Sequence, residues 1–189
     1  MINIVRINPQ LLNMKSVKLF GFIILLILTS CTAKKVAEFE NGIIKIKGCP
    51  EDGKCNIEQI KDSQISLQED STGELYPQID KSNTYHLYKF TFDRDVEENI
   101  ADAEHQEVIY FQIEKSNTFR ELNDKALDRA KVIYGRHCRC PGENGYEAIL
   151  SGSLYFETFR QVTEIRLQIK PEKLPISMKK VETNVTFYD

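Results

Sequence analysis

Residues 85–92, with the sequence YHLYKFTF, decide the fold class of this chain. Alternate residues of a β-strand point to opposite faces of a sheet, and aromatic residues favour strands. One face of this stretch would carry His86, Tyr88, Phe90 and Phe92, and the other Tyr85, Leu87, Lys89 and Thr91. Because the first face is almost wholly aromatic, the stretch predicts a β-strand with that face in the core.

Further stretches show the same alternation. Residues 107–113, EVIYFQI, place Ile109, Phe111 and Ile113 on one face, and we expect this strand to pair with 85–92. Residues 163–170, TEIRLQIK, form another clear strand, which Pro171 ends. Shorter strands are predicted at 36–47 (a hairpin that turns at Asn41-Gly42), at 65–67, and at 132–140, 146–150, 154–159 and 185–188.

The sequence also predicts one short helix. Thr118 and Glu121 have the spacing of a capping box, and apolar residues follow at helical intervals, which places the helix at 119–130. About eight short strands and one helix predict a mainly β domain, built as an antiparallel sandwich or barrel. An α+β fold is the alternative.

A short apolar run near the N-terminus, residues 19–28 (LFGFIILLIL), follows Lys15 and Lys18, and no acidic residue precedes it. A helix needs about 20 apolar residues to cross a bilayer, so this run is too short to span one. A basic start, a short apolar centre and small residues after it are typical of an export signal.

This run ends in Leu28-Thr29-Ser30-Cys31, which resembles the lipobox of bacterial lipoproteins. The resemblance implies cleavage between Ser30 and Cys31, a diacylglycerol on the Cys31 sulfur and a further acyl chain on its amino group. Two or three such chains anchor a protein stably. The chain would thus comprise a signal peptide (1–30, or 14–30 if translation starts at Met14), a lipidated cysteine with a short tether (31–35) and a single β-rich domain (36–189). An ordinary signal peptide cut near Ser30 is the alternative.

The charge balance bears on partners and location. The chain has 25 basic and 28 acidic residues, and cleavage would remove three basic ones, Arg6, Lys15 and Lys18. A negative net charge argues against nucleic-acid binding and against a polybasic contact with anionic lipid, so the acyl chains are the expected contact with the membrane. Thr32 stands where an aspartate would retain an enteric lipoprotein in the inner membrane. The resemblance therefore favours the outer membrane of the cell envelope, on its periplasmic face.

The expected domain contains four cysteines, Cys49, Cys55, Cys138 and Cys140. An even number in an exported chain predicts two disulfides. Residues two apart in a strand are about 6.5–7 Å apart at Cα, more than the usual disulfide span of about 5.5–6 Å. We therefore expect each early cysteine to pair with a late one, with local pairing as the alternative. The Cys-x5-Cys and Cys-x-Cys pairs, followed by Gly145-Tyr146, resemble those of small envelope lipoproteins, and this resemblance implies no function.

A metal or redox site is the other interpretation of the late cysteines. His137, Cys138 and Cys140 are three potential soft-metal ligands within four residues. Residues 93–104 place carboxylates at the spacing of a calcium loop but lack its glycine, so we expect no calcium there. The sequence contains no nucleophile, metalloprotease or phosphate-loop motif and nominates no catalytic residue.

These observations predict a lipid-anchored envelope protein whose domain binds or scaffolds an envelope protein or ligand. We expect no cofactor beyond the lipid on Cys31, and enzymatic activity is the less favoured interpretation. One alternative is a barrel that binds an apolar ligand in a cavity lined by Tyr88, Phe90 and Phe111. The second is a metal- or redox-handling protein that uses Cys138 and Cys140.

Overall fold

The computed structural model describes residues 46–95 and 104–187. This part of the chain is mainly β, as the sequence predicts, with a single short 3-10 helix, η1 (Asp124–Ala130). Its strands are β1 (Gly53–Ile60), β2 (Ser63–Glu69), β3 (Leu75–Lys81), β4 (Tyr85–Arg94), β5 (His105–Glu114), β6 (Phe119–Asn123), β7 (Ile133–Cys138), β8 (Gly145–Ala148), β9 (Gly152–Phe159), β10 (Val162–Ile169) and β11 (Lys180–Val185).

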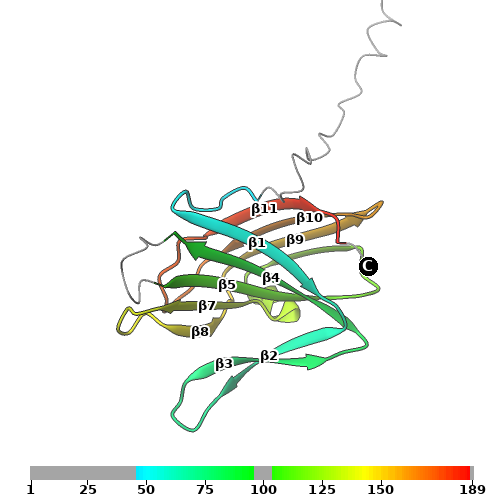
Figure 1. Ribbon diagram of the computed structural model, residues 1–189. Coiled ribbons are helices and arrows are strands. Elements are labelled where there is room, and N and C mark those ends of the chain that lie inside the picture. The colour runs from blue at the N-terminus through cyan, green and yellow to red at the C-terminus, as the bar shows by residue number, and fades with distance from the viewer. Residues whose placement is uncertain (1–45, 96–103, 188–189) are drawn as a thin grey trace, which may run out of the picture. The chain divides into compact units, whose positions relative to one another are not determined.

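Two antiparallel sheets make up most of the domain (Figure 1). The first has the strand order β1-β4-β5-β7-β8 and the second β11-β10-β9-β6. The predicted pairing of the two clearest strands is confirmed, because Tyr88 of β4 lies opposite Phe111 of β5. Among the described residues neither sheet closes on itself, so of the two architectures expected from the sequence the structure is the sandwich.

The inner faces of the two sheets share one apolar core. On the five-stranded sheet the core residues are Ile57, Tyr88, Phe90, Phe92, Ile109, Phe111, Ile113 and Tyr134. On the four-stranded sheet they are Leu122, Leu154, Phe156, Ile165, Leu167, Val181 and Val185. Each large apolar side chain buried in this way stabilises the fold by about 1.5–3 kcal/mol. The alternation seen in the sequence thus fixes which face of each strand points inward.

The outer face of β4 and β5 is covered as well. The β2–β3 hairpin lies against it, and a second cluster forms there from Ile65, Leu87, Val108, Tyr110 and Ile133. Gly135 of β7 faces Tyr146 of β8 across the sheet. A Cβ atom at Gly135 would lie 2.9 Å from Val108 Cγ2 and closer still to the Tyr146 ring, so only glycine leaves room for that ring.

The predicted helix at 119–130 is wrong over its first five residues. Phe119–Asn123 forms β6 and pairs with β9, where Leu122 lies opposite Leu154. Thr118 and Glu121 therefore do not form a capping box; instead the N–H of Thr158 donates to the carbonyl of Thr118. Only Asp124–Ala130 is helical, and Leu127 and Ala130 are its buried residues. Pairing with β9 supplies main-chain hydrogen bonds that outweigh the helical spacing of the apolar residues.

Most of the predicted hairpin at 36–47 lies outside the described residues. Lys47 is described, and its main chain exchanges two hydrogen bonds with Glu182 of β11. Within 46–95 and 104–187, no helix has the length and apolar composition that a membrane span requires.

Candidate functional site

The inner face of the five-stranded sheet becomes polar at one end. Along β5, the apolar row Ile113, Phe111 and Ile109 continues with Glu107 and His105. The register places Arg136 of β7 opposite Glu107 and Cys138 opposite His105. We call the four buried or half-buried polar residues Arg94, His105, Glu107 and Arg136 the polar end.

Glu107 is the centre of the polar end and is fully buried. Its two oxygens each accept a hydrogen bond of 3.0 Å from the N–H of Ser177, and Oε2 also accepts one of 3.1 Å from the N–H of Met178. Arg136 Nη1 is 3.6 Å and His105 Nε2 is 3.2 Å from Oε1. A buried carboxylate is tolerated only when it is paired in this way.

A second buried carboxylate, Glu147 of β8, acts on the same segment. It accepts hydrogen bonds from the main-chain N–H groups of Glu172 (2.9 Å), Lys173 (3.2 Å) and Leu174 (2.8 Å). Residues 171–178 form no regular element, so their amides need partners from elsewhere. Glu107 and Glu147 supply them, and both carboxylates therefore serve as structural anchors of this segment.

Two side chains of β7 also bind the carbonyl of Pro175 in this segment. It accepts hydrogen bonds from Tyr134 Oη at 2.8 Å and from Arg136 Nη1 at 3.0 Å. Burial raises the pKa of Tyr134 well above its ordinary range, with the nearby Glu107 charge acting in the same direction. The phenol is thus a neutral donor at neutral pH.

Beside the polar end lie the two late cysteines. A ring nitrogen of His105 and the Sγ atoms of Cys138 and Cys140 all lie within 4.8 Å of one another. His105 is 7% exposed, and the two cysteines are half-buried. This trio offers one nitrogen and two sulfur atoms, the donors that soft metal ions prefer.

His137, the histidine that the sequence placed with these cysteines, is not part of the trio. Neighbouring strand residues point to opposite faces, so His137 lies on the outer face, where its Nε2 is 2.8 Å from Tyr146 Oη. Burial lowers the pKa of His137. His105 was missed because it follows the acidic residues 93–104 and precedes the strand predicted at 107–113, whereas β5 begins at His105. Alternate residues of the strand share a face, so extending the alternation from Ile109 through Glu107 would have placed His105 on the inner face.

The two disulfides pair locally, so the expected cross-link between early and late cysteines is wrong. Cys49 bonds Cys55 with a Cα separation of 5.8 Å, and Cys138 bonds Cys140 with one of 5.2 Å. The second distance is shorter than that of a fully extended strand because β7 ends at Cys138 and Cys140 stands in the following turn. Both separations fit the usual disulfide geometry.

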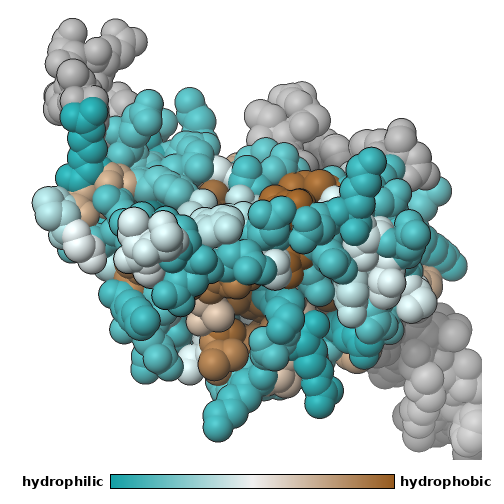
Figure 2. Space-filling view, turned by 90° about the horizontal axis from the view of Figure 1, so that it is seen from below, coloured by the Kyte–Doolittle hydropathy of each residue, from teal (hydrophilic) through white to brown (hydrophobic). Residues whose placement is uncertain are grey.

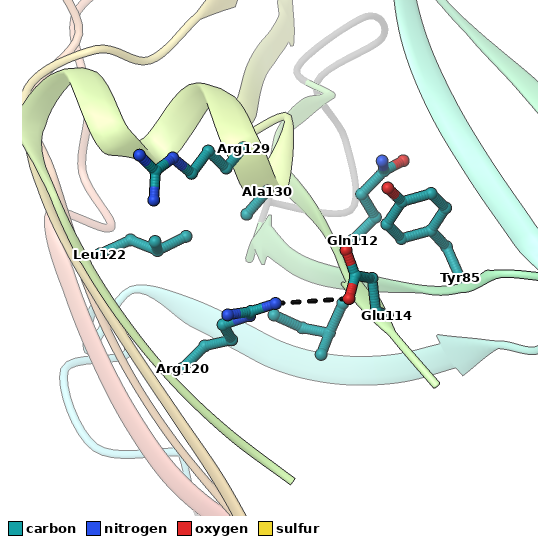
Figure 3. Close-up of a pocket in the computed structure, with 8 residues that line it drawn as sticks. Tyr85, Gln112, Glu114, Arg120, Leu122, Arg129 and Ala130 are labelled. Carbon is teal, nitrogen blue, oxygen red and sulfur yellow. Dashed lines mark hydrogen bonds and ion pairs between the residues drawn. The ribbon is translucent and has the colours of Figure 1, made fainter. Parts of the chain in front are cut away.

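A pocket of about 360 Å³ lies away from the polar end, near η1 (Figure 3). Tyr85, Gln112 and Glu114 of the first sheet face Arg120 of β6 and Arg129 of η1 across it, and Arg120 Nη2 is 3.3 Å from Glu114 Oε2. These five side chains are polar, so the pocket suits a polar ligand.

The apolar cavity expected from the sequence is filled. Tyr88 and Phe111 stack with ring centroids 5.1 Å apart, and Phe90 lies 6.3 Å from Phe111. All three side chains belong to the packed core, and the pocket near η1 is lined by other residues. On the face seen in Figure 2, apolar surface is confined to separate patches among hydrophilic residues.

No protein-family model matches this chain, and comparisons with curated proteins and with solved structures also give no match. The interpretation of the site therefore rests on the chemistry of its own residues.

Proposed function

We propose that this protein is a lipid-anchored protein of the bacterial cell envelope whose β-sandwich binds or scaffolds a partner and catalyses no reaction. The observation that carries the proposal is the sequence Leu28-Thr29-Ser30-Cys31 behind a basic start and an apolar run too short to span a bilayer. Acyl chains on Cys31 would hold the domain at the membrane.

The cysteine pairing supports export. The two disulfides use Cys49, Cys55, Cys138 and Cys140, so Cys31 is the fifth cysteine and stands at the lipobox. Disulfides persist in oxidising compartments such as the periplasm and are rare in the cytoplasm. By the same proposal, Thr32 directs the protein to the outer membrane, with the domain in the periplasm.

The engagement of the buried carboxylates argues against a catalytic role for these two groups. Glu107 and Glu147 are occupied by main-chain amides of residues 172–178, and a general acid or base must instead reach a substrate. The pocket near η1 is the candidate ligand site. Arg120 is paired there with Glu114, so Arg129 is the cation that favours a polar, anionic ligand over the apolar one expected for a barrel.

Lipidation can be tested by labelling cells with radioactive palmitate. The unaltered protein is expected to take up label and to partition into detergent, whereas Cys31→Ala should remain an unlabelled, uncleaved precursor. Ser30→Ala, which keeps a small residue before the cleavage site, is the matched control and should be labelled. Cleavage of Cys31→Ala at the normal rate would contradict the proposal. Density-gradient separation of the two membranes then tests the outer-membrane location.

The binding role can be tested with a photo-cross-linking residue in place of Tyr85, an aromatic residue that lines the pocket and leaves both arginines intact. In intact cells this variant is expected to give an adduct of higher mass. The same residue in place of Lys125, exposed on η1 and outside the pocket lining, is the control. Equal adducts from both positions, or none from either, would count against a partner at this pocket.

A further inference from the structure

The side chains of Cys138, Cys140 and His105 lie close together, and the proposed membrane anchoring uses none of them. Three ligand atoms within 4.8 Å of one another come from two strands and a turn that the β5–β7 pairing brings together. In the structure the two sulfurs are joined as a disulfide. We propose that reduction of this disulfide turns the trio into a binding site for one Cu(I) ion.

The Cys138–Cys140 disulfide closes a smaller loop than Cys49–Cys55 does. By loop-closure entropy alone it therefore stabilises the fold less, which leaves room for another role. Both late cysteines are half-buried rather than enclosed in the core, so a small thiol can reach them.

The step that opens the site needs a dithiol reductant. Its two thiols become one disulfide, while the Cys138–Cys140 bond breaks and each sulfur gains one electron and one proton. Binding of Cu(I) then releases the two protons and forms two copper–sulfur bonds. The copper stays in the Cu(I) state throughout, so no further oxidant or reductant is required.

His105 has the carboxylate partner that is typical of a metal-binding histidine. Its Nε2 is 3.2 Å from Glu107 Oε1, and metal-binding histidines usually place their second ring nitrogen on such a carboxylate. This leaves Nδ1 for the metal, where the neighbour is Arg94 Nη1 at 3.5 Å, the weak limit of a hydrogen bond. Arg94 can give up that contact because its Nε lies 2.9 Å from Asp52.

The number of ligands favours Cu(I) over Zn²⁺. Thiolates suit both ions, so the donor atoms alone do not decide between them. A structural Zn²⁺ site takes four protein ligands, whereas this trio supplies three, and Glu107 is occupied by the amides of Ser177 and Met178. Zn²⁺ would therefore need a further ligand from outside the protein, whereas three donors complete a trigonal Cu(I) site.

The experiment uses the full mature protein in detergent, reduced with a phosphine and freed of it under anaerobic conditions. Cu(I) is titrated against a coloured chelator. The Cys138→Ser/Cys140→Ser variant measures the copper that any other thiols bind. The unaltered reduced protein is expected to bind one Cu(I) ion more than this variant. His105→Asn is expected to lower the affinity at least tenfold, since even the loss of an outer-shell partner costs about 10–100-fold.

His137→Asn is the matched control, because His137 is adjacent to Cys138 but lies on the outer face. The affinity of this variant for Cu(I) should equal that of the unaltered protein. Equal affinities for His105→Asn and His137→Asn, or tight binding by the unreduced protein, would overturn the proposal. X-ray absorption of the copper-loaded unaltered protein gives an answer that needs no variant. A nitrogen beside two sulfurs is expected, and a shell of sulfur alone would overturn the assignment of His105.

Discussion

The carboxylate of Glu107 accepts hydrogen bonds from the main-chain amide of Ser177, 70 residues further along the chain, at 3.0 Å through both oxygens. Glu107 belongs to the first sheet, whereas Ser177 precedes β11 of the second. The contact therefore connects the two layers through a buried charge rather than through apolar packing. Removal of this carboxylate would take away the acceptor of the Ser177 and Met178 amides and the partner of His105 Nε2.

Glu107→Ala is expected to lower the free energy of unfolding by about 3–5 kcal/mol, the usual cost of breaking a buried ion pair from one side. Urea denaturation at neutral pH measures this loss. Glu164→Ala is the control, because Glu164 pairs with Arg166 at 3.4 Å with its side chain 36% exposed, and such a pair contributes less than about 1 kcal/mol. Similar losses for the two variants would mean that Glu107 is not an anchor.

Glu147→Ala should loosen the chain locally. Hydrogen bonds to a charged acceptor contribute about 1.5–3 kcal/mol each, so amide hydrogen exchange at 172–174 is expected to accelerate at least tenfold. Glu157→Ala is the control, since Glu157 accepts a hydrogen bond from Tyr155 Oη and contacts no amide of this segment. Unchanged exchange at 172–174 in Glu147→Ala would show that the segment is held by other contacts.

Gly135→Ala tests the close approach of Tyr146. The added methyl group would meet the Tyr146 ring and Val108, and overpacking of this kind costs about 1–3 kcal/mol. In the double variant Gly135→Ala/Tyr146→Ala the ring is gone, so the effects of the two changes should not add. A double-mutant cycle measured by urea denaturation gives the coupling. A coupling near zero would mean that the ring moves aside without cost.

The sandwich could be predicted because its main strands carry long, regular alternation. Residues 85–92, 107–113 and 163–170 each bury one face, and the structure confirms these faces in Tyr88, Phe111 and Ile165. Pattern alone did not decide between strand and helix at 119–123, where an apolar residue every three or four positions fits a helix. The strand is decided by the pairing of Leu122 with Leu154, two residues that are 32 positions apart in the chain, so the local sequence carries no signal of it.

The polar end was not predicted for a related reason, although the alternation of β5 does extend back to His105. His105 and Glu107 are polar residues that point inward, and their partners Ser177 and Met178 stand in a segment without periodicity. Polar residues next to an acidic stretch are typical of a solvated loop, so the strand predicted from the sequence begins at 107, two residues later than β5. The disulfide prediction failed because it assumed an extended chain through Cys140, where the structure has a turn.

Tyr88 makes stability sensitive to alkaline pH. Burial raises the pKa of Tyr88 from 10.0 to about 12, although its hydroxyl accepts a hydrogen bond of 2.8 Å from Gln59 Nε2. Between these two values the unfolded state loses the phenolic proton and the folded state keeps it. The unfolded state then binds fewer protons, so the free energy of unfolding falls as pH rises, by at most about 1.4 kcal/mol per pH unit for this group.

Tyr88→Phe is therefore expected to lower the free energy of unfolding by about 1 kcal/mol at pH 7, through the lost hydrogen bond. Above the ordinary tyrosine pKa, the free energy of unfolding of this variant should fall less steeply with pH than that of the unaltered protein. Urea denaturation at a series of alkaline pH values measures the two slopes. Tyr76→Phe, at a position that is 43% exposed, is the control and should keep the slope of the unaltered protein. Since burial also raises the pKa of Tyr134, some decline should persist in Tyr88→Phe. Parallel slopes for Tyr88→Phe and the unaltered protein would show that Tyr88 ionises equally in both states.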